Sequence, residues 1–161
     1  MSKQAYSYLV KILSVRDYSE HKLRQKLSEK KYPANEIDDA IDEIKKRGYL
    51  KEEIYTESRV RGFMNKGYSV DYIRQKLAQE KLTVPEDFIR EVFVDHETSE
   101  EEQIERLARK KISSKTELDY DQKGKILRFL ISKGHDYSLS KKVLESLVGE
   151  LKDDLPFQDS I

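Results

Sequence analysis

The chain has 161 residues, of which 31 are Lys or Arg and 31 are Asp or Glu, so its formal net charge is zero. It has no cysteine, which excludes a disulfide scaffold and a cysteine-ligated zinc or redox site. No apolar run reaches the roughly 20 residues that a membrane helix needs, and the first residues lack the apolar core of a signal peptide. We therefore expect a soluble, cytoplasmic protein.

The hydrophobic pattern predicts an all-α fold. Helix-favouring residues are abundant, only 6 Gly and 3 Pro interrupt them, and no stretch alternates apolar and polar residues as a half-buried strand does. In the first part of the chain, apolar residues at helical spacing predict helices over 6–13, around Leu23 and Leu27, and over 37–44. We expect Ser19 to cap the second helix, Asn35 to cap the third, and Gly48 to end it.

The same pattern continues downstream. It predicts a second set of helices at 52–66, 70–80 and 85–94, and a third set at 100–111, 121–133 and 138–151.

These three sets of helices are repeats of one unit. Leu23-Arg24-Gln25-Lys26-Leu27 recurs fifty positions later as Ile73-Arg74-Gln75-Lys76-Leu77. We match Ile37 and Ile41 with Phe88 and Val92, and in the divergent third copy Leu127 and Ile131 take the places of Leu23 and Leu27. The predicted organisation is three tandem three-helix repeats at 1–50, 51–96 and 97–151, stacked as an extended array with or without curvature. An acidic tail at 152–161 follows, which we expect to be mobile or loosely docked.

Zero net charge conceals basic blocks. Residues 11–31 hold seven basic against three acidic side chains, and residues 58–81 hold six against two. Such faces are most often merely solvated, but they can also meet phosphates or carboxylates of a partner. The repeated Arg24/Lys26 and Arg74/Lys76 could form a basic strip suited to a periodic partner. The candidate contact residues are Lys22, Arg24, Lys26, Arg59, Arg61, Lys66, Arg74, Lys76, Arg109 and Lys110.

The tyrosines at predicted helix junctions have a structural and a functional interpretation. Tyr18, Tyr49 and Tyr68 are expected to wedge adjacent helices together with the ring buried. Stacking on exposed bases is the alternative, for which Tyr72 and Tyr120 are the more exposed candidates.

The sequence contains no constellation that indicates catalysis, a metal site or a cofactor site. Gly62 and Gly67 are followed by Tyr68 where a phosphate-binding loop needs Lys. The histidines, His21, His96 and His135, lack the partner spacing of a helical zinc site. We predict that the protein is not an enzyme and holds no cofactor.

Two passages resemble the RecX family of bacterial regulatory proteins. In one, Gly48-Tyr49-Leu50 opens an acidic, aromatic stretch; in the other, Gly67-Tyr68 precedes Ile73-Arg74-Gln75-Lys76-Leu77. The resemblance covers roughly residues 5 to 150 and extends to the tandem three-helix repeats. It implies a negative regulator that binds the filament of the recombinase RecA on single-stranded DNA. It also implies inhibition of ATP hydrolysis, strand exchange and the co-protease role in the SOS response, and for some members direct DNA binding.

Two other classes of function remain open on the residues alone. A three-helix unit can be a helix-turn-helix reader of duplex DNA, in which Arg24-Gln25 and Arg74-Gln75 would contact bases. It can also be a helical-repeat scaffold for another protein. We expect a monomer with a RecA filament, and single-stranded DNA directly or through it, as partners, and no membrane.

Overall fold

The computed structural model describes residues 3–153. These residues form nine α-helices and no strand, which confirms the all-α prediction. The helices are α1 Lys3–Leu13, α2 Glu20–Glu29, α3 Ala34–Lys46, α4 Glu52–Asn65, α5 Val70–Gln79, α6 Glu86–Asp95, α7 Glu100–Ile112, α8 Tyr120–Ser132 and α9 Tyr137–Asp153.

The chain divides into two compact units. Unit 1 runs to Val60 and includes Leu77–Thr83, whereas unit 2 consists of Arg61–Lys76 and the chain from Val84 onward. Both α4 and α5 therefore contribute residues to both units.

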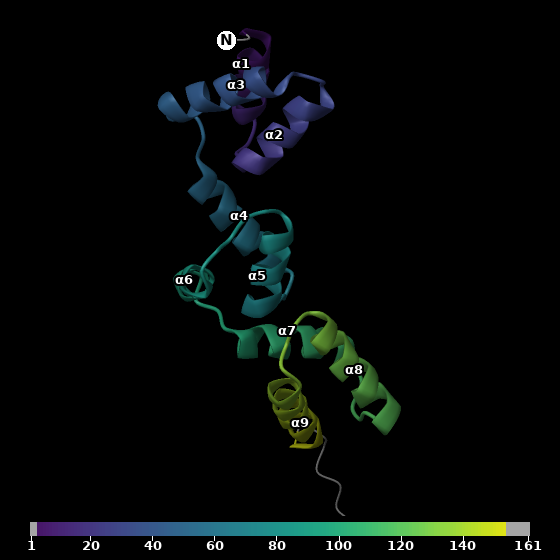
Figure 1. The fold of residues 1–161 in the computed structure, drawn as a ribbon. Coiled ribbons are helices and arrows are strands. Elements are labelled where there is room, and N and C mark those ends of the chain that lie inside the picture. The colour runs from purple at the N-terminus through teal and green to yellow at the C-terminus, as the bar shows by residue number, and fades with distance from the viewer. Residues whose placement is uncertain (1–2, 154–161) are drawn as a thin grey trace, which may run out of the picture. The chain divides into compact units, whose positions relative to one another are not determined.

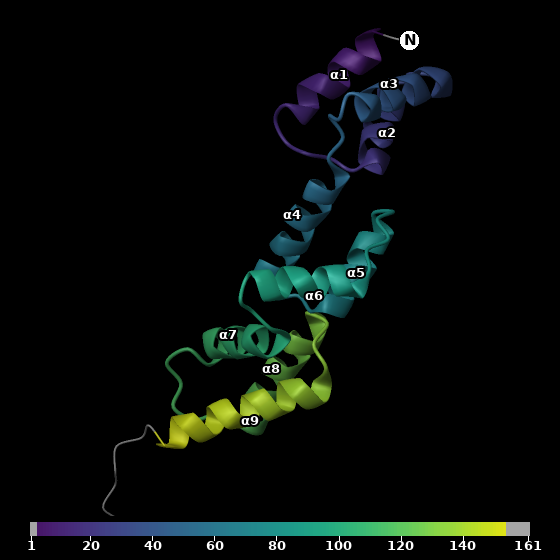
Figure 2. The ribbon, with the colours of Figure 1, turned by 90° about the vertical axis from the view of Figure 1, so that its left-hand side faces the viewer.

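Unit 1 is built around a bundle of α1, α2 and α3, which lie together in both views (Figures 1 and 2). The predicted pair Leu23 and Leu27 is fully buried against α3 residues such as Ile41 and Ile44. At about 25 cal/mol per Å² of apolar surface removed from water, this burial is the main stabilisation of the bundle. The core consists of Ala5, Leu9, Tyr18, Leu23, Leu27, Ile37, Ala40, Ile41 and Ile44.

The start of α3 differs from the prediction. Pro33, not Asn35, is the residue before the helix, and no side chain caps it. The Pro33 carbonyl already accepts the Ile37 N–H at 3.0 Å, so Asn35 lies within the first turn. Proline is compatible with this position because its fixed φ, here -68°, suits the extended residue before a helix and because it lacks an N–H that would need a partner.

The α6 helix begins in the same way, after Pro85. The two prolines lie 52 residues apart, so Ile37 corresponds to Ile89 and not to Phe88. Ile89 is fully buried, whereas Phe88 is only partly buried, so the predicted match was wrong by one residue.

In unit 2, α7, α8 and α9 form a second bundle (Figures 1 and 2). Its α8 residues also differ from the prediction by one position. Ile126 and Leu130 are buried, while Leu127 is partly buried and Ile131 is 45% exposed. One residue turns a side chain by about 100° around the helix, which is enough to move it from the core to its edge. The α9 residues Val143 and Leu147 are both buried.

The α9 helix continues to Asp153, two residues into the segment predicted as a tail. The rest of that segment, 154–161, lies outside the described residues.

Candidate functional site

The turn between α4 and α5 in unit 2 brings aromatic and basic side chains together. The rings of Tyr68 and Tyr72 stack with centroids 4.2 Å apart and an interplanar angle of 12°. Lys133 lies with its Nζ 4.2 Å from the Tyr68 centroid, and Lys76 lies 5.8 Å from that of Tyr72. Because both rings are only partly buried, the cations and the ring faces form one surface, which we call the Tyr68 surface (Tyr68, Tyr72, Lys76 and Lys133).

Local sequence signals position this surface. Gly67 has φ +89°, which ends α4, and the Tyr68 N–H then donates to the Phe63 carbonyl at 3.2 Å. The Ser69 hydroxyl accepts the Tyr72 N–H at 3.1 Å and so caps α5. These contacts fix the Gly-Tyr-Ser segment in front of the helix that carries Lys76.

Unit 1 carries a related arrangement fifty residues earlier. Lys26 and Arg16 lie 5.3 Å and 4.7 Å from the centroid of Tyr18. Ser19 caps α2 by accepting the Lys22 N–H at 3.1 Å, as predicted. Tyr18 itself is 8% exposed, so here the cations cover an aromatic ring of the core. We call Arg16, Tyr18 and Lys26 the Tyr18 surface.

The other tyrosines of the sequence prediction differ in burial. Tyr49 is 44% exposed, so the expectation that it wedges helices with its ring buried was wrong. It follows Gly48 at the end of α3 and its N–H bonds to the Ile44 carbonyl, but its ring is left at the surface. Tyr120 is 90% exposed, as expected.

Four of the predicted contact arginines are paired with carboxylates of their own unit. Arg24 bonds to Glu20 at 3.2 Å and to Asp38 at 2.6 Å. These bonds, that to Asp38 first, raise the pKa of Arg24. Glu20 also pairs with Lys45, a contact that is the main cause of its lowered pKa. The other pairs are Arg59 with Glu80, Arg74 with Asp71, and Arg109 with Glu105 and Glu150.

The predicted contact lysines and one predicted contact arginine are not paired with carboxylates that the structure describes, so their charge is available to a partner. Lys22, Arg61, Lys66 and Lys110 are exposed and make no ion pair with a residue of the range 3–151, whose side chains the structure describes. Within the same range, the ammonium groups of Lys26 and Lys76 make cation–π contacts with tyrosine rings and no ion pair. A paired arginine must give up its carboxylate before it can bind an anion, whereas these side chains need not. The uncompensated positive charge thus lies mainly on lysines.

Sequence reasoning missed two polar residues in the core of unit 2. Gln103 is fully buried, and its amide nitrogen donates to the carbonyls of Met64 at 3.0 Å and Tyr68 at 2.8 Å. His135 is 3% exposed, and its Nε2 lies 2.7 Å from the Gly67 carbonyl. Gln103 joins the turn that carries the Tyr68 surface to α7, and His135 joins it to the turn between α8 and α9. A single sequence could not have shown that Gln103 and His135 are buried, because their hydrogen-bond partners are main-chain atoms 35 to 68 residues away.

The protonation of His135 follows from its burial. Removal from water lowers the pKa of His135, which the hydrogen bond to the Gly67 carbonyl and the charge of Glu100 oppose. Burial therefore favours the neutral over the charged form of the ring.

The described residues contain no group of three or more His, Cys, Asp or Glu side chains placed to hold a metal ion. Among the same residues, no helix combines the length and apolar character that crossing a membrane requires.

The fold and surface define a class: an all-α protein of three-helix domains that carries aromatic and basic surfaces. Two family models match the chain, the first three-helix domain of RecX over residues 5–43 and the third over residues 99–144. Regulatory protein RecX of Haemophilus influenzae strain Rd is 37% identical over 135 residues, which cover 83% of this chain and 88% of that protein. Regulatory protein RecX of Mannheimia succiniciproducens is 32% identical over the same coverage.

Solved structures agree with the fold. The crystal structure of a regulatory protein RecX has a TM-score of 0.69 at 21% identity and covers 88% of this chain and 70% of that chain. RecX from Lactobacillus salivarius has a TM-score of 0.68 at 19% identity, covering 89% and 94%. The chain belongs to the RecX family, a family of regulatory proteins and not of enzymes. The resemblance seen in the two sequence passages is thereby confirmed.

Proposed function

We propose that this protein is a negative regulator of the recombinase RecA. In this proposal it binds the RecA filament on single-stranded DNA and inhibits ATP hydrolysis, strand exchange and co-protease activity, and so restrains recombinational repair and the SOS response. Membership of the RecX family supports the link to RecA, and the Tyr18 and Tyr68 surfaces support binding to an anionic partner. The protein would act in the cytoplasm as a monomer with three domains at 1–50, 51–96 and 97–151.

The observation that carries this proposal is a lysine at the same position of two repeats that lies against a tyrosine ring, Tyr18 for Lys26 and Tyr72 for Lys76. Lys26 and Lys76 are fifty residues apart, each lies against a ring, and neither is neutralised by a described carboxylate. Phosphates and carboxylates are the groups such lysines bind, and a filament of protein on DNA offers both at regular intervals.

The hydrogen bonds of Arg74 and Gln75 argue against a helix-turn-helix reader of duplex DNA. Base recognition would need Arg74 and Gln75 free to reach the major groove. In the structure the Arg74 guanidinium bonds to Asp71 at 2.7 Å, and the Gln75 amide donates to Asp71 at 2.9 Å. Reading bases would cost both of these contacts.

The direct test is single-stranded-DNA-dependent ATP hydrolysis by RecA from the same cell, titrated with this protein. We expect hydrolysis to fall at substoichiometric or near-stoichiometric amounts. Unchanged hydrolysis, together with no co-sedimentation on RecA filaments, would contradict the proposal. Duplex-DNA binding and a protein scaffold would then be separated by a DNA titration.

A pair of double variants tests the lysines. Lys26→Ala with Lys76→Ala should raise the concentration needed for half-inhibition about tenfold, since each lost anion contact is worth about 0.5–1 kcal/mol. The control, Lys46→Ala with Lys125→Ala, removes the same charge from exposed positions of α3 and α8 and should change it less than about twofold. Equal effects of the two double variants would show that only overall charge matters.

A further inference from the structure

A groove runs between α8 and α9 of unit 2 and is not part of the Tyr68 surface. It encloses about 550 Å³. Its lining extends from Tyr120 to Ile131 on α8 and from Tyr137 to Val148 on α9. Each of these spans is about 17 Å long at about 1.5 Å per residue, which is the length of about three turns of a helix.

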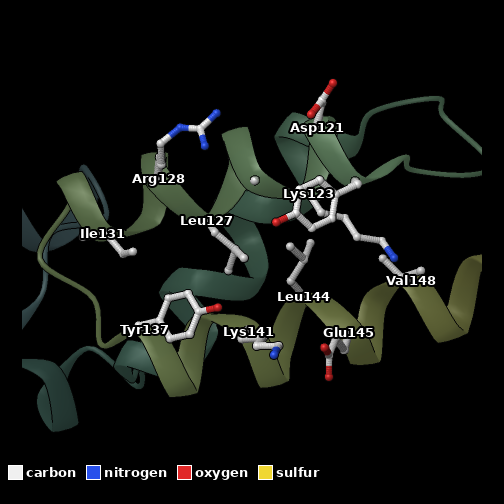
Figure 3. A pocket seen from close by; sticks show the side chains of 12 residues that line it. Asp121, Lys123, Leu127, Arg128, Ile131, Tyr137, Lys141, Leu144, Glu145 and Val148 are labelled. Atoms are coloured by element: carbon white, nitrogen blue, oxygen red, sulfur yellow. The ribbon is translucent and has the colours of Figure 1, made fainter.

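The floor of the groove is aliphatic. Figure 3 shows Leu127 and Leu144 pointing toward one another from the two helices, with the ring of Tyr137 beside them. Ile131 is 45% exposed and Tyr137 is 52% exposed, a large apolar area for side chains that line one groove. Contiguous exposed apolar surface of this kind marks an interaction site more often than isolated apolar residues do.

Acidic and basic side chains occupy different parts of the groove. The carboxylates of Asp121 and Glu145 point to the two outer edges, away from the space between the helices (Figure 3). Lys123 reaches from α8 toward α9 beside Val148, and Lys141 lines the α9 side. Neither lysine makes an ion pair with any of residues 3–151. A ligand between the helices therefore meets an apolar floor and two uncompensated cations.

We propose that this groove docks an acidic amphipathic helix of a protein partner. An apolar stripe at i, i+3, i+4 and i+7 would cover Leu127, Ile131 and Leu144, as helices do in grooves formed by two other helices. Glutamates or aspartates beside the stripe would pair with Lys123 and Lys141. Complementary charge selects an acidic helix over a basic one.

Single-stranded nucleic acid is the competing occupant, because tyrosines and lysines also bind bases and phosphates. The aliphatic floor disfavours it, since bases stack on flat aromatic faces.

The experiment uses the full chain with ¹³C-labelled Leu, Ile and Val methyl groups, observed by NMR. The probe is a synthetic peptide of about 18 residues, five helical turns, with leucines at helical spacing and glutamates elsewhere. Two matched peptides differ in one respect each: lysine replaces every glutamate in one, and a central proline breaks the helix in the other.

We expect the glutamate peptide to shift the methyl signals of Leu127, Ile131, Leu144 and Val148, and both matched peptides to bind at least about tenfold more weakly. The double variant Lys123→Glu and Lys141→Glu should weaken the glutamate peptide about tenfold, because two attractions become repulsions. The control is Lys125→Glu with Lys142→Glu, which makes the same change of net charge on exposed neighbours outside the groove. It should weaken the peptide less than about threefold.

Several results would overturn the proposal. These are no methyl shifts at about 1 mM glutamate peptide, equal binding of the lysine peptide, and equal effects of the two double variants. Larger shifts of the same methyl groups with oligothymidylate would assign the groove to nucleic acid. Shifts of these methyl groups on dilution of the free protein would assign it to a second copy, and shifts on removal of residues 154–161 would assign it to this chain itself.

Discussion

Replacing Gly134 with alanine should destabilise unit 2 much more than the backbone conformation alone would suggest. Gly134 has φ +88° and follows α8. A Cβ at this position would lie 2.6 Å from the Tyr72 Cβ and would also collide with the Ser69 hydroxyl that caps α5. The left-handed conformation costs an alanine about 1 kcal/mol, and overpacking adds about 1–3 kcal/mol. We therefore expect a loss of about 2–4 kcal/mol in the free energy of unfolding.

Gly48 provides a matched control in unit 1. It has a similar φ of +72°, but a Cβ at this position would meet no atom within 4 Å, so Gly48→Ala should cost only about 1 kcal/mol. Native-state hydrogen exchange would read each unit separately, through the buried amides of Leu130 in unit 2 and Ile41 in unit 1. Losses that agree within about 0.5 kcal/mol would refute the argument, because they would leave only the backbone term that both glycines share.

Three further outcomes can be measured by urea unfolding. Gln103→Met should cost about 2–4 kcal/mol, since two hydrogen bonds are lost and the partly buried Tyr68 carbonyl is left without the Gln103 donor. Gln25→Met at an exposed position should stay within about 0.5 kcal/mol, and equal values would contradict the role of the buried amide. Because burial lowers the pKa of His135, the unfolded chain binds more protons as the pH falls below about 6.5. The free energy of unfolding should therefore decrease from about pH 7 downward, and His135→Gln should flatten that part of the pH profile. An unchanged slope would show that this pH dependence does not come from His135. Leu130→Ala should cost about 2–5 kcal/mol and Ile131→Ala less than about 1 kcal/mol, and the reverse order would restore the predicted register of α8.

The predicted helices were accurate where periodicity and a breaker residue agreed. The helix predicted at 70–80, the second of the second repeat, is α5 at Val70–Gln79. Ser69 supplies its cap, and Ile73 and Leu77 form its buried pair. Local hydrogen bonding and helical spacing are properties of neighbouring residues, so one sequence is enough to show them.

The candidate site was predicted only in part. The sequence located basic residues on the repeated helices, and Lys26 and Lys76 do lie beside tyrosine rings. It could not show that Arg24 is paired with Asp38, which is 14 residues away and on another helix. Whether a cation is available to a partner depends on which carboxylates the fold brings within reach, and spacing along the chain does not contain that information.

The sequence by itself determined the helical class, the repetition at fifty residues and the family, since each is written in residue order and type. The tertiary structure decided which side of each helix is covered. It buried Ile126 in place of Leu127, enclosed Gln103 and His135, and left Ile131 beside the α8–α9 groove. The physical reason is that burial depends on the direction from which another helix packs, and a shift of one residue turns a side chain by about 100°.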